Sequence, residues 1–221
     1  MAIAGIPWWT TDIGGFHGAR TDDPDFHRLY IRWFEYGCFC PVMRLHGNRN
    51  PQEGYGAEQI GSGSDNEIWS FGDKAYEISK KYIFLRERLR DYIRTQMKKA
   101  HEDGTPMMRP VFYDFPTDQE SWNVEDAYLF GPDLYVAPVM EDHVTEREVY
   151  LPDGTAWFNA WTGEKYEGGQ NVTVAAPLDT IPVFVKEGAD AEKLLNISLN
   201  KRMLPLTGSR RTATKNPVLT M

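Results

Sequence analysis

The sequence is poor in the groups that commonly bind metals or carry redox chemistry. Only two cysteines occur in 221 residues, Cys38 and Cys40, and their spacing fits neither a metal-binding knuckle nor a redox C-x-x-C pair. The five histidines are scattered without metal-ligand spacing. Phosphate loops, dinucleotide fingerprints and nucleophile elbows are absent. We therefore predict no metal and no cofactor, and we expect two reduced, buried thiols in a cytoplasmic protein.

Long apolar runs and an excess of basic charge are also lacking. No apolar stretch reaches the roughly 18 residues of a transmembrane helix, and the net charge of −8 disfavours binding to a phosphate backbone. We therefore predict neither a membrane nor a nucleic acid as partner. Residues 191–221 differ from the rest, because they hold six basic groups, one acidic group and no aromatics. We expect this basic tail to be a divergent extension, either disordered or a non-native reading of the gene.

Aromatic residues, by contrast, are abundant: the chain has 7 Trp, 11 Tyr and 11 Phe. Aromatic faces stack on sugar rings and nucleobases, so this composition is compatible with a carbohydrate or nucleotide pocket. A large aromatic core explains the same composition equally well.

The first half of the chain alternates strand-like and helix-like patterns. The apolar run 2–9 suits a buried strand, and a helix is predicted from about Pro24 to Tyr36, ended by Gly37. Residues 38–45 suit a second buried strand. A long helix is predicted from an N-cap at Asp73 to just before Gly104. Two β/α units in succession predict a parallel sheet or barrel.

After Pro106 the pattern changes to short strands separated by turn signals. This pattern is typical of an antiparallel β-sandwich. We place the boundary near residues 116–126, which gives one domain over 1–115, a second over 116–190 and the tail over 191–221. The strand-like runs are 110–115, 127–130, 134–139, 146–151, 156–159, 171–175 and 181–185.

Two polar loops follow the two predicted parallel strands, where functional side chains gather in β/α folds. The first loop presents Asp12, Phe16 and His17, and the second presents Arg44, His46 and Arg49. A carboxylate at Asp12 can accept hydrogen bonds from sugar hydroxyls, pair with an arginine, or cap its own loop.

A neutral imidazole at His46 can donate to one hydroxyl group and accept from another, although spacing alone favours a purely structural histidine. Phe16 and Trp9 can form an apolar platform or belong to the core. Spacing alone leaves these alternatives open.

Several ordered sequence blocks resemble glycoside hydrolase family 31, which includes α-glucosidases and α-xylosidases. The first two blocks are Gly5-Ile-Pro-Trp-Trp-Thr-Thr-Asp-Ile-Gly-Gly-Phe16 and, about thirty residues later, Arg44-Leu-His-Gly47. The blocks at 104–110, 130–139 and 181–188 fit as well, so the resemblance covers roughly residues 3–189. Only the sequence after the Glu187-Gly188 element departs from the family pattern.

The resemblance implies the last two β/α units of a (β/α)8 TIM barrel, followed by an antiparallel β-sandwich domain. Family members hydrolyse terminal α-glycosidic bonds with two carboxylates and retain the anomeric configuration. Both carboxylates are expected from earlier barrel strands, before residue 1, so no catalytic residue is assigned here. We expect the chain to be a C-terminal piece of a larger enzyme, inactive alone and associating with the N-terminal part of the barrel.

The resemblance also implies a set of substrate-binding residues for an α-linked oligosaccharide or glycoside. Asp12 matches a buried aspartate that supports a sugar-binding arginine, and that arginine is itself absent from this chain. Phe16 matches an aromatic wall, and His46 matches a histidine that binds sugar hydroxyls. Trp9 and Arg44 are expected to support them from behind.

Two other functions remain open on sequence alone. One is a complete enzyme with its own carboxylate pair, for instance Asp12 with Asp65 or Glu67. The other is a non-catalytic carbohydrate-binding module built on the β-rich half.

Overall fold

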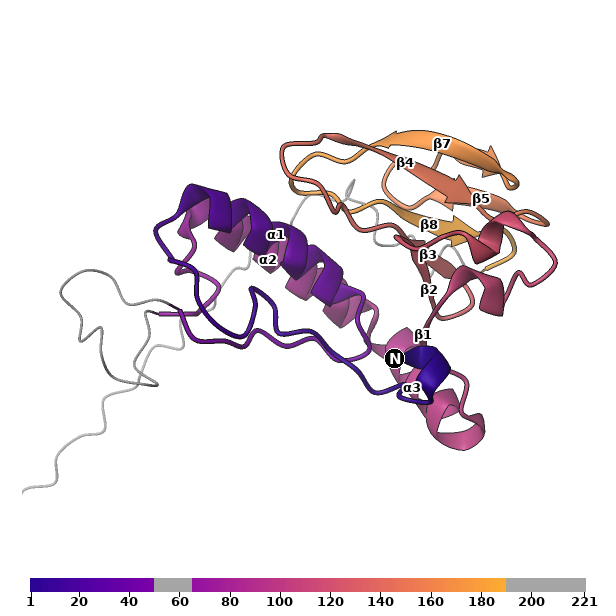
Figure 1. Ribbon diagram of the computed structural model, residues 1–221, viewed down its shortest axis with the longest axis horizontal. Helices are drawn as coiled ribbons and strands as arrows, with labels where there is room; N and C mark the ends of the chain where they lie inside the picture. Colours follow the sequence, from indigo (N-terminus) through magenta and orange to yellow (C-terminus); the bar gives the residue numbers. More distant parts are fainter. Residues whose placement is uncertain (50–64, 190–221) are drawn as a thin grey trace, which may run out of the picture.

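The computed structural model describes residues 1–49 and 65–189 (Figure 1). Its first half contains one short 3-10 helix and three α-helices. The predicted basic tail lies outside the described residues, as does much of the loop before the second helix. The helical elements are η1 (Ala2–Ala4), α1 (Pro24–Cys38), α2 (Gly72–Arg88) and α3 (Arg90–Asp103).

Helix α1 begins where the sequence predicts. The Asp23 carboxylate accepts a hydrogen bond from the Asp25 amide at 2.9 Å, and Pro24 occupies the first helical position. The predicted end at Gly37 is wrong, because the helix continues to Cys38. Gly37 is a packing position: a Cβ atom there would lie 2.5 Å from Cδ1 of Ile13.

The long helix predicted from Asp73 is in fact two helices, α2 and α3, separated at Leu89. Asp73 is not the N-cap, since Phe71 holds that position without a side-chain hydrogen bond. No proline or glycine marks the break. Leu89 is only 2% exposed and belongs to the same hydrophobic cluster as residues on both helices. The end of α3 agrees with the prediction, because Gly104 follows in the left-handed conformation.

The strands predicted at 2–9 and 38–45 do not form. The first segment begins with η1. The isolated parallel bridges, Ile13 to Leu45 and His17 to Asn48, lie at or beyond the ends of the two segments. Among the described residues each segment has only the other as its pairing partner, and two bridges do not make a ladder. The parallel direction expected of successive β/α units is nevertheless present.

The second half folds into antiparallel sheets, as predicted. A six-stranded sheet has the order β1-β2-β3-β8-β5-β6, and β4 pairs with β7 in a second sheet (Figure 1). The strands are β1 (Met108–Arg109), β2 (Tyr128–Phe130), β3 (Leu134–Val136), β4 (Glu146–Leu151), β5 (Ala156–Asn159), β6 (Lys165–Glu167), β7 (Gln170–Ala175) and β8 (Val183–Lys186).

The strand predicted at 110–115 is wrong. Strand β1 already ends at Arg109, and the next element is a 3-10 helix, η2 (Val111–Tyr113). Pro110 has no amide hydrogen to donate to a ladder. In addition, Arg109 pairs with Asp114, five residues later, at 2.6 Å.

Strand β6 has no counterpart in the prediction. Because β1 already pairs with β2, the six-stranded sheet starts at Met108, whereas the domain boundary near 116–126 stays a prediction.

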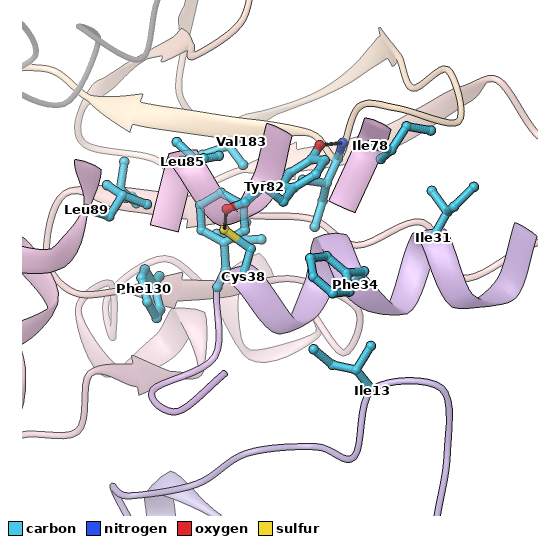
Figure 2. Close-up of a cluster of buried hydrophobic side chains, with 14 of the residues drawn as sticks. Ile13, Ile31, Phe34, Cys38, Ile78, Tyr82, Leu85, Leu89, Phe130 and Val183 are labelled. Atoms are coloured by element: carbon cyan, nitrogen blue, oxygen red, sulfur yellow. Dashed lines mark hydrogen bonds between the residues drawn. The ribbon is translucent and has the colours of Figure 1, made fainter. Parts of the chain in front are cut away.

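The central strands of the six-stranded sheet, β2, β3 and β8, are buried on both faces. In β3, Tyr135 points into a cluster shared with β4 and β7, so the two sheets form a sandwich. Leu134 and Val136 point the opposite way, into a cluster shared with the helices. Figure 2 shows this second cluster, in which β-domain residues Phe130 and Val183 meet helix residues. Its labelled helix residues include Phe34, Cys38, Tyr82 and Leu85, and Leu89 joins it from the break between α2 and α3.

Candidate functional site

The two polar loops run side by side in parallel. The Val42 amide donates to the Trp9 carbonyl at 3.0 Å, and the Ile13 amide donates to the Arg44 carbonyl at 3.1 Å. Further along, the Asn48 amide donates to the Phe16 carbonyl at 2.9 Å. This register places each candidate residue of the first loop beside one of the second.

Asp12 and Arg44 form an ion pair across the two loops, with Nη2 of Arg44 donating to Oδ1 of Asp12. The Asp12 side chain is 21% exposed and the Arg44 side chain 52% exposed. A pair this accessible contributes at most about 1 kcal/mol to folding. The carboxylate is therefore held in place by a partner that can move to meet a ligand.

Phe16 and His46 lie next to each other beyond this ion pair. Their ring centroids are 5.5 Å apart and their planes are tilted by 39°. Both side chains are exposed, Phe16 to 55%. His17 also packs edge-on against Phe16, with centroids 4.3 Å apart. An open aromatic face beside an imidazole offers an apolar surface and a hydroxyl-binding group together.

Trp9 lies apart from the surface formed by Asp12, Arg44, Phe16 and His46. It packs edge-on against Tyr36 of α1, with centroids 6.4 Å apart, and lines a cavity of about 340 Å³. The first loop is also attached to α1 through Trp33, whose Nε1 donates to Oγ1 of Thr11 at 2.9 Å. The structure therefore places Trp9 at the base of the first loop.

Arg86 of α2 holds the segment that leads from α1 into the second loop. Its guanidinium donates to the carbonyls of Cys38 at 2.7 Å, Cys40 at 2.6 Å and Pro41 at 2.7 Å. Burial lowers the pKa of Arg86. Burial also raises the pKa of both cysteine thiols to about 12, so neither is a thiolate nucleophile at neutral pH.

Two residues behind the loops were not among the predicted binding residues. Arg49 was named only as a residue of the second loop, and Asn66 was missed. Arg49 is 1% exposed, and its guanidinium contacts backbone carbonyls of the first loop. Asn66 connects Arg49 to the second loop. The glycines of the two loops were the sequence signal that could have indicated this role of Arg49. Gly14, Gly15 and Gly47 all adopt positive φ beside this arginine.

Two negative findings concern the described ranges 1–49 and 65–189. Within them, no group of three or more histidine, cysteine, aspartate or glutamate side chains has the arrangement of a metal site. No helix there has both the length and the apolar character needed to span a membrane.

Comparison with known proteins identifies the family. Residues 1–96 match the TIM-barrel domain of the family 31 glycosyl hydrolases, and residues 104–189 match the C-terminal domain of the same family. The chain belongs to glycoside hydrolase family 31. This confirms the predicted fold class, the end of a (β/α)8 barrel followed by an antiparallel β domain.

Individual relatives cover most of this chain but only part of their own length. An alpha-xylosidase from Saccharolobus solfataricus is 38% identical over 86% of this chain and 24% of its own. Alpha-glucosidase 2 from Bacillus thermoamyloliquefaciens is 35% identical over 86% and 22%. The crystal structure of a family 31 alpha-xylosidase from a soil metagenome, complexed with xylose, superposes with a TM-score of 0.81 at 52% identity, over 88% of this chain and 30% of its own. The chain thus spans about a quarter of the length of these curated relatives.

Proposed function

We propose that this chain forms one wall of the sugar site of a retaining α-glycosidase acting on terminal α-glucosides or α-xylosides. The observation that carries this proposal is the pairing of Phe16 with His46 beside the Asp12–Arg44 ion pair. Relatives named alpha-xylosidase and alpha-glucosidase, one of them holding xylose, support the choice of sugar.

Each residue of this wall has a role that its surroundings support. The exposed face of Phe16 packs against the apolar face of a sugar ring. His46 donates to one hydroxyl and accepts from another. Asp12 accepts hydrogen bonds from a bound ligand or its partner arginine, and Arg44 holds it in place until a ligand arrives. Trp9 supports the first loop from α1.

In this proposal the two catalytic carboxylates lie outside this chain. Retaining glycosidases need a nucleophile and an acid about 5–5.5 Å apart, flanking the bond that is cut. Asp12 is engaged by Arg44, and Glu67 accepts a hydrogen bond from Ser70 at 3.1 Å. We propose that the pair lies in the part of the relatives that this chain does not match, and that this chain associates with that part of the barrel.

The proposal is tested by binding and turnover measured on the same purified chain. Calorimetry with xylose and glucose should show saturable binding that His46→Ala and Phe16→Ala each weaken. Assays on aryl α-glucosides and α-xylosides should show no turnover. Turnover by the wild-type chain that is lost in Asp12→Asn would contradict the proposal that the catalytic carboxylates lie outside this chain, and it would indicate a complete enzyme.

The binding-module alternative gives a different result in the same assays. Binding that is unchanged in both site variants would place the sugar on the β domain rather than on the two loops. Binding of neither sugar by the wild-type chain would contradict the proposed function itself.

A further inference from the structure

Arg49 is a buried cation that makes four hydrogen bonds to uncharged groups. Its Nη1 donates to the carbonyls of Gly14 at 2.7 Å and Gly18 at 3.1 Å, and its Nη2 donates to the Gly15 carbonyl at 2.6 Å. Its Nε donates to Oδ1 of Asn66 at 2.9 Å. Burial lowers the pKa of the guanidinium. Among the described residues its hydrogen-bond partners are all uncharged, and burying a charge without a counter-charge is costly.

Asn66 extends these contacts to the second loop. Its carboxamide oxygen accepts from Arg49, while Nδ2 donates to the Gly47 carbonyl at 3.1 Å. Arg49 and Asn66 together therefore bind the backbone on both sides of the candidate site. The carbonyls held in the first loop belong to the residues around Phe16, and the carbonyl held in the second belongs to the neighbour of His46.

Gly47 lies at a close approach of the two loops. A Cβ atom at Gly47 would overlap both the Gly15 carbonyl oxygen and Nη2 of Arg49. Gly14 and Gly15 adopt φ of +84° and +82°, a region that suits glycine. These glycines let the carbonyls of the first loop converge on one guanidinium. The planar fork of arginine can bind several carbonyls at once, which the single ammonium group of lysine cannot reproduce.

We propose that Arg49 and Asn66 are positioning residues of the sugar site, which set the spacing between Phe16 and His46. The proposal rests on the function proposed above and adds the residues that determine the width of the site. The two rings come from different loops. Their backbones are joined directly through Asn48, whose amide donates to the Phe16 carbonyl at 2.9 Å and whose carbonyl accepts from the Gly18 amide at 3.0 Å. Arg49 and Asn66 add side-chain hydrogen bonds to these backbone contacts. The Arg49–Asn66 pair fixes one loop relative to the other without contacting the sugar.

A spectroscopic measurement separates positioning from general stabilisation. The Phe16 ring, 5.5 Å from the His46 ring, contributes a ring-current shift to the carbon-bound protons of His46. Phe16→Leu removes that contribution and so calibrates it in a proton–carbon NMR spectrum. We expect Arg49→Lys and Asn66→Ala to move the His46 signals in the direction that Phe16→Leu moves them.

Binding is measured by calorimetry with xylose and with glucose on the same variants. We expect Kd to rise about tenfold in both, the effect of losing about one well-placed hydrogen-bonding interaction. Arg90→Lys is the matched control, because Arg90 makes an exposed ion pair with Glu87 on the outside of the helices. It should change neither the His46 signals nor Kd.

The outcomes are distinct. His46 signals and Kd that both stay at wild-type values in Asn66→Ala overturn the proposal, even if Arg49→Lys does not fold. Signals that move while Kd does not also overturn it, because the spacing would then be irrelevant to binding. A wild-type chain that binds neither sugar contradicts the proposed function, and the His46 signals alone then decide whether the pair fixes the loops.

Discussion

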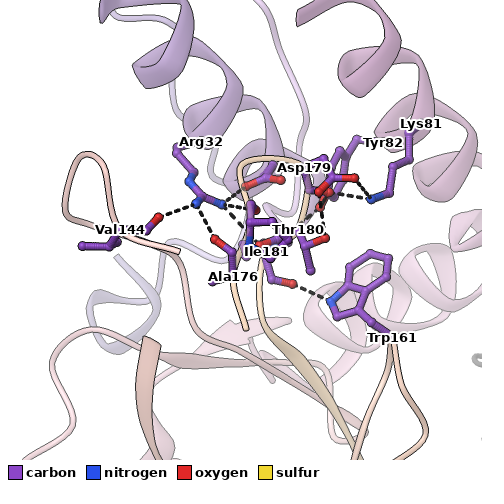
Figure 3. Close-up of polar contacts among 11 residues, drawn as sticks. Arg32, Lys81, Tyr82, Val144, Trp161, Ala176, Asp179, Thr180 and Ile181 are labelled. Atoms are coloured by element: carbon purple, nitrogen blue, oxygen red, sulfur yellow. Dashed lines mark hydrogen bonds and ion pairs between the residues drawn. The ribbon is translucent and has the colours of Figure 1, made fainter. Parts of the chain in front are cut away.

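The carboxyl group of Glu35 accepts a hydrogen bond from Arg32, one turn earlier on α1, at 3.2 Å. Their side chains are 1% and 12% exposed. Figure 3 shows Arg32 reaching from α1 into the segment that precedes β8. This pair therefore lies inside the junction between the helices and the β domain. The same guanidinium donates to the carbonyls of Ala176 at 2.7 Å, Pro177 at 3.0 Å, Thr180 at 3.2 Å and Val144 at 3.3 Å.

Glu35 should make the stability of this junction depend on pH. Burial raises its pKa from 4.5 to about 8, although Arg32, Tyr82 and Lys81 favour the charged form. The unfolded chain thus loses this proton at lower pH than the folded chain. The stabilisation is complete below about pH 4.5 and falls as pH rises to about 8, by up to about 1.4 kcal/mol per pH unit. We expect Glu35→Gln to flatten the dependence of Tm on pH over this range.

Thermal melting at about pH 5, 6.5 and 8 checks this expectation against the wild-type chain. Glu77→Gln is the control, because that carboxylate lies exposed on α2 and pairs with Lys80. A Tm of Glu35→Gln that follows the wild-type pH profile would show that Glu35 is already ionised in the folded chain.

Replacing Arg32 should loosen the junction strongly. We expect Arg32→Met to lower the free energy of unfolding by about 2–4 kcal/mol, because it removes the donor to Glu35 and to the buried carbonyls. The loss should be larger at pH 9 than at pH 6, since the unpaired carboxylate would be charged. Urea denaturation measures both. Arg28→Met, whose arginine pairs with exposed Asp25 and Asp142, should cost about 1 kcal/mol or less.

Gly37 in α1 should resist replacement by alanine. Helix propensity alone favours Gly37→Ala by about 1 kcal/mol. The added Cβ, however, would meet Cδ1 of Ile13 at 2.5 Å and Cγ1 at 2.8 Å, so we expect a net loss of about 1–3 kcal/mol. The double variant with Ile13→Ala should show a favourable coupling energy in a thermodynamic cycle measured by urea denaturation. A stabilised single variant would contradict the close contact between α1 and the first loop.

Asp12 should matter for binding more than for folding. Because Arg44 is half exposed, we expect Asp12→Asn to change the free energy of unfolding by less than about 1 kcal/mol. The same variant should weaken xylose or glucose binding about tenfold or more, since a ligand-facing acceptor is lost. Calorimetry and thermal melting of one sample compare the two effects. A large loss of stability with unchanged binding would make the ion pair structural.

Features set by local chemistry could be predicted from the sequence. The Asp23 cap of α1 and the left-handed Gly104 after α3 follow from the preferences of single residues. Most β-domain strands follow from apolar runs between turn signals. The pairing of Asp12 with an arginine was one of the readings left open, and the structure names Arg44 as its partner.

Other features needed the tertiary structure. The break at Leu89 and the close contact of Gly37 with Ile13 depend on which residues of distant segments share one core. Parallel strands were predicted at 2–9 and 38–45, yet strands require neighbours to pair with, which a single segment cannot reveal. Sequence alone thus determined α1, most strands of the β domain, the family blocks and the candidate residues. Only the fold decided that Arg49 and Asn66 join the two loops, because hydrogen bonds between a guanidinium and distant carbonyls leave no periodic pattern in the chain.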